Sequence, residues 1–188
     1  MDGVLKVLVP GLDECWALDL HWDPALGARS RIGDLVYRAK YHREPEARDR
    51  LADEMISGVQ SLVDLTRSAV RRGQVVIGVP AVDGGDSALP TYLAARVADA
   101  TEMRREPGLL VRVAQRQKVK FAAHQDRNAV VTGAFVCSRA VPGTVVVVID
   151  DLVQSGATLG EAARVLRAAG ASRVIGFAAT RVAKGMVM

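Results

Sequence analysis

Residues 145–159 read VVVVIDDLVQSGATL, and this stretch decides the fold. Four valines and an isoleucine form a continuous apolar run, which predicts a strand buried on both faces, as in a parallel sheet. Two adjacent carboxylates, Asp150 and Asp151, follow the run, and a small turn-prone loop then leads into a helix. Because open α/β sheets bind ligands at the carboxyl ends of their strands, we expect a binding site at this point.

The loop after the two acids has the composition of a phosphate-binding loop. Main-chain N–H groups and the positive dipole end at a helix N-terminus favour a phosphate. Gly156 permits a sharp backbone path, and two adjacent acids can accept hydrogen bonds from vicinal hydroxyls. The pattern therefore predicts a receptor for a ribose 5-phosphate with a divalent cation, Mg²⁺. The predicted phosphate contacts are Val153, Gln154, Ser155, Gly156, Ala157 and Thr158.

Strand and helix patterns alternate along the rest of the chain, which predicts an α/β fold. Strands are expected at residues 4–9, 75–79, 109–113, 130–136 and 174–178, and helices after Ser30, from Pro45 to Gly73, at 91–100 and at 159–169. We expect one mostly parallel central sheet flanked by helices. Residues 1–40 are predicted to form a small N-terminal hood, and residues 41–188 the core.

Composition limits the classes of function. The chain has 188 residues, enough for one domain, and no apolar run of the roughly 20 residues that span a bilayer. Its N-terminus is acidic where a signal peptide is basic, so a cytoplasmic location without membrane association is expected. Cys15 and Cys137 form no metal-knuckle spacing. A net charge of +4 favours phosphate-rich ligands or nucleic acid, although 4% aromatic residues supply few base-stacking platforms.

Three other interpretations of the central motif compete with a ribose 5-phosphate receptor. An apolar strand ending in two acids also occurs in P-loop NTPases, but these need G-x-x-x-x-G-K-[ST], which is absent from the sequence. A dinucleotide site needs G-x-G-x-x-G directly after a strand, which is also absent. The third interpretation is a buried strand with an acidic, solvated end. The loop and helix that follow the acids at once argue against it.

The motif VVVVIDDLVQSGATL resembles the PRPP-binding signature of type I phosphoribosyltransferases, in which two acids hold the ribose hydroxyls and the next loop holds the 5-phosphate. The resemblance implies that Asp150 and Asp151 are the catalytic ribose contacts and the ligands of Mg²⁺. Gln154 stands where a threonine is common. The implied ligand is PRPP, or a nucleoside or ribose 5-phosphate.

A narrower resemblance covers most of the chain. Residues 33–44 (GDLVYRAKYHRE), 112–135 and 174–185 resemble, in order, segments of the ComF-like phosphoribosyltransferases associated with DNA-uptake competence. The family's N-terminal zinc ribbon is missing. Lys40 and Tyr41 lie in the first segment, where a binding edge and ordinary helix solvation explain Lys40 equally well.

The loop that handles pyrophosphate in this family departs from the family pattern. Here it reads VPAVDGGDSALPTY, with Asp83 and Asp86 and no basic residue, whereas the family's loop is rich in arginine. Two acids there would repel pyrophosphate unless Mg²⁺ intervenes. A basic segment farther along the chain is therefore expected to compensate this charge. The predicted pyrophosphate contacts are Ala81, Val82, Asp83, Gly84, Arg112, Lys118, Lys120 and Arg127.

Three hypotheses about function follow from the sequence. The first is an enzyme that transfers the phosphoribosyl group of PRPP to a nitrogen acceptor and releases pyrophosphate. The second is a non-catalytic regulatory module that binds PRPP or a nucleotide. The third is a competence accessory that acts near DNA, for which the modest positive charge is the only support from the residues. The edges of such sheets often pair, so a homodimer is one expectation.

Overall fold

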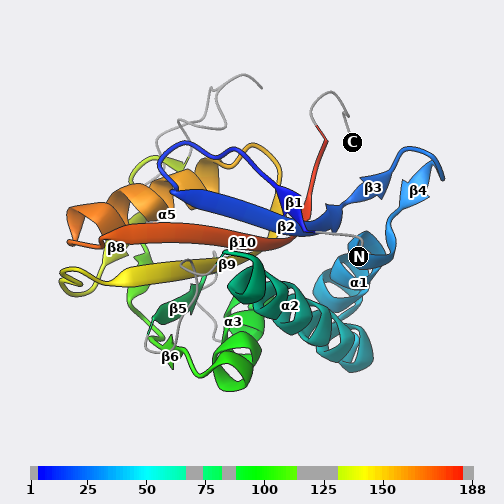
Figure 1. Ribbon diagram of the computed structural model, residues 1–188. Helices are drawn as coiled ribbons and strands as arrows, with labels where there is room; N and C mark the ends of the chain where they lie inside the picture. The colour runs from blue at the N-terminus through cyan, green and yellow to red at the C-terminus, as the bar shows by residue number, and fades with distance from the viewer. Residues whose placement is uncertain (1–3, 67–73, 82–87, 114–130, 184–188) are drawn as a thin grey trace.

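The computed structural model describes residues 4–66, 74–81, 88–113 and 131–183, and these contain a six-stranded sheet (Figure 1). Across the sheet the strands lie in the order β1 (Leu5–Lys6), β2 (Glu14–Leu20), β10 (Arg173–Arg181), β9 (Val145–Val153), β5 (Val75–Gly78) and β6 (Arg104–Arg105). β1 pairs antiparallel with β2, and the other neighbours pair in parallel. The predicted mostly parallel sheet is confirmed.

Helices cover both faces of the sheet. One face carries α1 (Arg31–Tyr37), α2 (Pro45–Thr66) and α3 (Leu89–Thr101), and the other carries α5 (Ala157–Ala168) (Figure 1). Two antiparallel two-stranded ribbons lie outside the central sheet. One pairs β3 (Trp22–Asp23) with β4 (Ala28–Arg29), and the other pairs β7 (Leu110–Arg112) with β8 (Phe135–Cys137). The β3–β4 ribbon projects from the body beyond α1, whereas β7–β8 packs on the α5 side.

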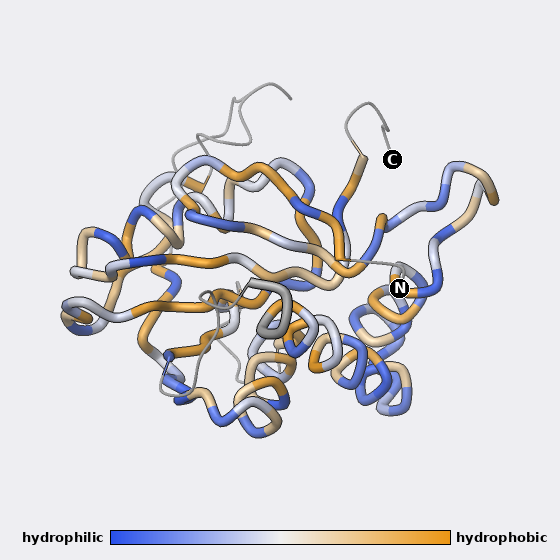
Figure 2. The backbone as a smooth tube through the Cα atoms, viewed as in Figure 1, coloured by the Kyte–Doolittle hydropathy of each residue, from blue (hydrophilic) through white to orange (hydrophobic). Residues whose placement is uncertain are grey.

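β9 shows why this arrangement suits the sequence. Val147 and Ile149 pack into the core shared with α1, α2 and α3, whereas Val146 and Val148 pack into the core shared with α5. Successive side chains of a strand point to opposite faces, so a strand covered on both faces needs apolar residues at every position. Figure 2 shows the central strands as mainly hydrophobic between helices with hydrophilic outer faces.

The turn from α1 into α2 has an unusual shape that matters for the site. Ser30 caps α1, because its Oγ accepts a hydrogen bond from Gly33 N–H at 3.0 Å. A π-helical segment, η1 (Arg38–His42), follows α1 directly and ends at Arg43, whose φ of 55° is left-handed. Pro45 then starts α2, as predicted, because its fixed φ suits the first helical turn.

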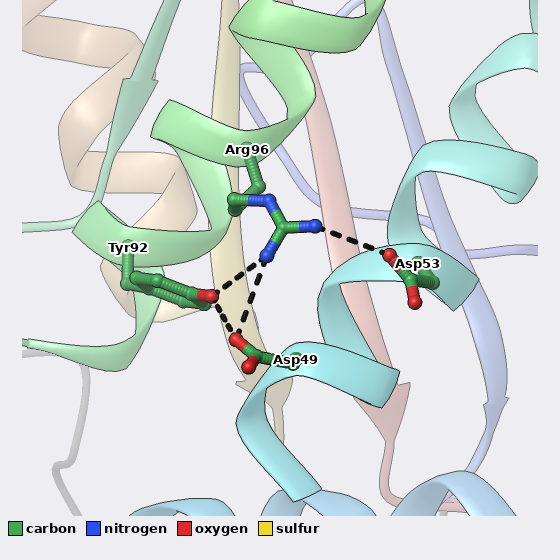
Figure 3. Close-up of polar contacts among 4 residues, drawn as sticks. All are labelled: Asp49, Asp53, Tyr92 and Arg96. Atoms are coloured by element: carbon green, nitrogen blue, oxygen red, sulfur yellow. Dashed lines mark hydrogen bonds and ion pairs between the residues drawn. The ribbon is translucent and has the colours of Figure 1, made fainter. Parts of the chain in front are cut away.

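α2 and α3 are joined by a polar cluster at the surface (Figure 3). Arg96 lies 3.5 Å from Asp49 and 3.3 Å from Asp53, and it donates a hydrogen bond to the hydroxyl of Tyr92 at 2.9 Å. Tyr92 in turn donates to Asp49. Exposed ion pairs of this kind contribute little stability. Their consequence is geometric, because they hold the ring of Tyr92 in place beside α2.

Several sequence predictions need correction. The expected strand at 130–136 is wrong in its first half, since residue 131 is helical, 132–133 form a turn and β8 begins at Phe135. β9 continues through both acids to Val153, and β1 is limited to two residues. β2 was not predicted at all, although it lies beside β10 in the central sheet. The division of the chain at residue 40 stays a prediction, and the expected end of α2 at Gly73 lies outside the described residues.

Gly78 brings β5 and α3 together, which yields a test of the fold. A Cβ atom at Gly78 would lie 2.4 Å from the carbonyl oxygen of Pro90 and 2.5 Å from the amide nitrogen of Thr91. Since backbone atoms cannot rotate away, Gly78→Ala must push α3 from the sheet. We expect the free energy of unfolding in a urea titration to fall by about 1–3 kcal/mol. An unchanged midpoint would contradict this packing.

Candidate functional site

The strand order creates a crevice between β5 and β9. From β5 the chain passes through α3 to β6, on one side, and from β9 it passes through α5 to β10, on the other. α3 and α5 also lie on opposite faces of the sheet. Open α/β sheets bind ligands at such a reversal, outside the carboxyl ends of the strands. A pocket of about 860 Å³ lies there, and Asp150, Asp151 and the start of α5 line it.

Asp150 and Asp151 form the polar end of the central strand in this pocket. Both are buried, and Oδ1 of Asp150 accepts a hydrogen bond from the backbone N–H of Asp151 at 2.8 Å. Burial raises the pKa of Asp150 well above its ordinary value, and the negative charge of Asp151 raises it further. These surroundings therefore favour the protonated form of Asp150.

Lys40, on η1, compensates this charge by direct contact with Asp151. Its Nζ lies 2.5 Å from Oδ2 of Asp151. Burial lowers the pKa of Lys40, but the charge of Asp151 outweighs this effect and the pKa lies above its ordinary value. Oδ2 of Asp151 thus accepts from the Lys40 ammonium, but a carboxylate offers about four acceptor positions in all. The carboxylate therefore retains acceptor capacity for a ligand hydroxyl.

Thr180 on β10 and His21, the residue after β2, hold the backbone of Asp151 in place. The Thr180 hydroxyl donates to the carbonyl oxygen of Asp151 at 3.3 Å, and Nδ1 of His21 lies 3.1 Å from the same hydroxyl. Since that hydroxyl proton is used toward Asp151, His21 serves as the donor to Thr180. Burial, and then the positive charge of Arg29, hold the pKa of His21 below its ordinary value. A neutral imidazole thus supports the strand end that carries the acids.

The loop before α5 forms the wall nearest the acids. Gly156 is the N-cap residue of α5, has a φ of 81° and offers no side chain to the helix end. Ser155 Oγ accepts a hydrogen bond from Ala157 N–H at 3.3 Å. The following N–H groups of the first helical turn have no partner within the helix, which makes this end a natural anion site. All the predicted phosphate contacts, residues 153–158, line the pocket.

The far wall comes from the end of β5 and the start of α3. Ala81, predicted as a pyrophosphate contact, lines the pocket together with Pro80. Arg112, also predicted, lines it too; its Nε donates to the carbonyl oxygen of Pro80 at 3.2 Å, and its guanidinium lies 4.9 Å from the ring centre of Phe135. The other predicted contacts lie outside the described residues: Val82, Asp83, Gly84, Lys118, Lys120 and Arg127.

The corner between η1 and α2 adds cations that sequence reasoning did not assign. The sequence explains Lys40 equally well by a binding edge and by helix solvation, and the structure places it against Asp151. Arg43 and Arg48 also line the pocket. The only available signal was the resemblance of residues 33–44 to a family segment. Nothing in helical periodicity marks Arg48 as facing a cavity.

The two acids fit a Mg²⁺ ion that arrives with phosphates. Mg²⁺ is usually bound by one or two carboxylates together with substrate phosphates and water, rather than by a complete protein cage. The described part of the chain holds no group of three or more His, Cys, Asp or Glu side chains arranged for a metal. Asp151 would use the acceptor positions that Lys40 does not occupy to hold such an ion.

Comparisons with known proteins give a partial likeness. No family model matches the chain, and no curated protein matches it. A solved structure described as the allosteric regulatory enzyme of purine biosynthesis is similar, with 26% sequence identity and a TM-score of 0.49. The match covers 76% of this chain and 30% of that one, so the chain spans less than a third of that enzyme's length. None of the described helices is long and apolar enough to cross a membrane.

Asp150 gives a prediction about stability and pH. Its folded-state pKa lies above the value of 3.8 for the free side chain, so the stability it contributes is fully present below that value and is lost as the pH rises through the folded pKa. Asparagine cannot ionise and can still accept from Asp151 N–H. We therefore expect Asp150→Asn to raise the Tm of the ligand-free protein near neutral pH, by roughly 2–4 °C per kcal/mol gained.

Differential scanning calorimetry across the acidic and neutral range checks this expectation. The difference in Tm between wild type and variant should shrink toward zero as the pH falls to about 2–3, where wild-type Asp150 is protonated in both states. A variant that is less stable than wild type at neutral pH would show that the buried charge is fully compensated.

Gly156 gives a prediction about the α5 loop. A Cβ atom there would require a left-handed alanine and would lie 3.0 Å from Cγ2 of Val9. We expect Gly156→Ala to lower the free energy of unfolding by about 1–3 kcal/mol and to weaken phosphate binding. Gly27→Ala is the matched control, because Gly27 also has a positive φ, of 60°, but has nothing within 4 Å of the added atom. Equal losses in both variants would assign the effect to φ alone.

Proposed function

We propose that this protein binds PRPP and transfers its phosphoribosyl group to a nitrogen acceptor, with release of pyrophosphate. One observation carries the proposal: the buried pair Asp150 and Asp151 and the uncapped N-terminus of α5 lie in one pocket at the chain reversal of the sheet. A sugar phosphate matches this pairing, because it presents hydroxyls and a phosphate a few bonds apart. The sequence resemblance to the PRPP-binding signature points to the same ligand.

In this mechanism the protein positions the sugar and compensates charge. The N–H groups at the start of α5 hold the 5-phosphate, while Asp150 and Asp151 accept hydrogen bonds from the ribose hydroxyls. The bond from C1 to the diphosphate oxygen breaks, and its electron pair leaves with pyrophosphate. The lone pair of the acceptor nitrogen forms the new bond to C1, and that nitrogen loses its proton to water. Such a reaction needs positioning and charge compensation more than a covalent nucleophile.

Asp151 is the residue that gains a second partner during binding. Without ligand it is paired with Lys40. A hydroxyl that donates to Oδ2 takes up the acceptor capacity that Lys40 leaves unused, and the ammonium remains close enough to keep the carboxylate charged. Mg²⁺, held by Asp150 and Asp151, would add positive charge beside the leaving pyrophosphate.

A second candidate function is a non-catalytic module that binds PRPP or a nucleotide and regulates a partner. The sequence of the loop after β5 favours it, because Asp83 and Asp86 stand where a pyrophosphate site needs positive charge. This candidate keeps the phosphate loop and the acids but has no productive place for the leaving group. Action on nucleic acid, a homodimer and a cytoplasmic location stay predictions.

Two measurements on the same samples test the proposal. Calorimetric titration with ribose 5-phosphate reports binding, and pyrophosphate release from PRPP with a panel of nitrogenous bases and amines reports catalysis. We expect Asp151→Asn to weaken ribose 5-phosphate binding about 10–100-fold, since a hydrogen bond to a charged group contributes about 1.5–3 kcal/mol. Asp53→Asn is the control, because it removes one charge from an exposed site on α2.

The outcomes separate the candidates. Ribose 5-phosphate binding together with pyrophosphate release supports the transferase. Binding without release for any acceptor in the panel supports the regulatory module. Absence of ribose 5-phosphate binding by the wild-type protein, or equal affinity in wild type and Asp151→Asn, would refute both.

A further inference from the structure

The pocket carries positive charge that the acids do not neutralise. Arg43 and Arg48 line the pocket, and neither makes an ion pair among the described residues. Their neighbour Arg38 behaves differently, since its Nη2 lies 2.6 Å from Glu44 and its Nη1 lies 3.6 Å from Asp34. The same short segment thus contains one neutralised arginine outside the pocket lining and two unneutralised arginines within it.

Arg48 is oriented by packing rather than by a carboxylate. Its guanidinium stacks on the ring of Tyr92, with 4.2 Å between the guanidinium carbon and the ring centre. The contacts of Tyr92 with Asp49 and Arg96 hold that ring in place (Figure 3). Stacking uses the flat face of a guanidinium and leaves the N–H groups on its edge for an anion. Nε of Arg48 is buried and has no hydrogen-bond partner among the described residues.

Arg43 is presented by an uncommon backbone conformation. It follows the π-helical turn η1 and has a φ of 55°, which is left-handed and unusual for a residue with a long side chain. π-helical turns and left-handed residues concentrate at functional sites, where they redirect a side chain. Here the backbone reverses direction at Arg43 before Pro45 starts α2, so the N-terminus of α2 lies between the two arginines in the chain.

The pocket walls near the end of β5 supply less positive charge than the corner that carries Arg43 and Arg48. Ala88, Leu89 and Pro90 at the start of α3 line the pocket and are uncharged. Arg112 stacks on Phe135 and already donates to the carbonyl of Pro80. The sequence between β5 and α3 contains Asp83 and Asp86 and no basic residue. Among the described residues that line the pocket, the corner between η1 and α2 supplies the arginines that are left for a second anionic group.

We propose that Arg43 and Arg48 form a second anion subsite that holds the diphosphate of the donor sugar, across the pocket from the α5 loop that holds its 5-phosphate. This inference rests on the proposed function and names residues for its leaving group. The corner between η1 and α2 takes over the charge that the acidic segment after β5 lacks. Two anion subsites separated by the ribose-binding acids would select a donor phosphorylated at both ends over a simple ribose 5-phosphate.

Direct binding of inorganic pyrophosphate tests the subsite. Calorimetric titrations are run in EDTA, so that affinity reflects contacts with side chains rather than with a cation. The test variants are Arg43→Asn, because asparagine tolerates a left-handed φ, and Arg48→Lys, because lysine keeps the charge but loses the stacked fork. We expect each to weaken pyrophosphate binding about 10-fold or more, and to change ribose 5-phosphate binding less than about 3-fold.

Arg50→Gln is the matched control, because Arg50 is an exposed residue of α2 outside the pocket lining. It changes the net charge as Arg43→Asn does and should leave pyrophosphate binding within about 2-fold of wild type. Arg43 makes no ion pair in the described structure, so Arg43→Asn stays informative even if Arg48→Lys disturbs the stacking on Tyr92.

Failure of this subsite is distinguishable from failure of the proposed function. No pyrophosphate binding by wild type, or equal losses in Arg43→Asn and Arg50→Gln, overturns the subsite while ribose 5-phosphate binding leaves the main site intact. Loss of ribose 5-phosphate binding in wild type overturns the proposed function. A parallel loss of both ligands in Arg43→Asn, with folding unchanged, would place Arg43 in the 5-phosphate site instead and also contradict the proposal.

Discussion

The cost of burying two adjacent carboxylates at the end of β9 governs the architecture around the pocket. A buried charge without a partner is strongly destabilising, and two neighbouring acids repel each other as well. Two features offset this cost. The surroundings of Asp150 favour its protonated form, and Lys40 forms an ion pair with Asp151. The backbone N–H of Asp151 satisfies one oxygen of Asp150. Buried titratable groups whose surroundings shift their pKa cluster at functional sites, and Asp150 has that character.

Lys40 can reach Asp151 only because of the shape of the preceding segment. Ser30 caps α1 and at the same time donates to the carbonyl oxygen of Leu20 at 2.6 Å, which ties the helix start to the end of β2. His21, the next residue, supports Thr180 and through it the carbonyl of Asp151. The π-helical turn η1 then carries Lys40 over the pocket. The unpredicted strand β2 is therefore part of the support for the acids, and not a peripheral addition to the sheet.

The parts that could be predicted from the sequence are those that local sequence determines. A run of valines before Asp150 fixes β9, and Pro45 fixes the start of α2, because strand burial and helix capping depend on a few neighbouring residues. β2 escaped prediction because ECWALDL mixes charged, aromatic and apolar residues, and its pairing partner β10 lies more than a hundred residues away. Arg48 could not be assigned for a similar reason, since its role depends on Tyr92 of another helix.

The distribution of charge around the pocket explains how one cavity can contain both acids and unpaired arginines. Asp151 and Lys40 neutralise each other at the base, so the arginines at the rim are not needed to balance the acids. α2, α3 and α5 all begin beside the pocket, and their positive dipole ends add to the potential there. A neutral ligand would gain nothing from this surplus. This surplus suits the ligand proposed above, whose hydroxyls would face the acids while its negative groups extend toward α5 and toward the corner between η1 and α2.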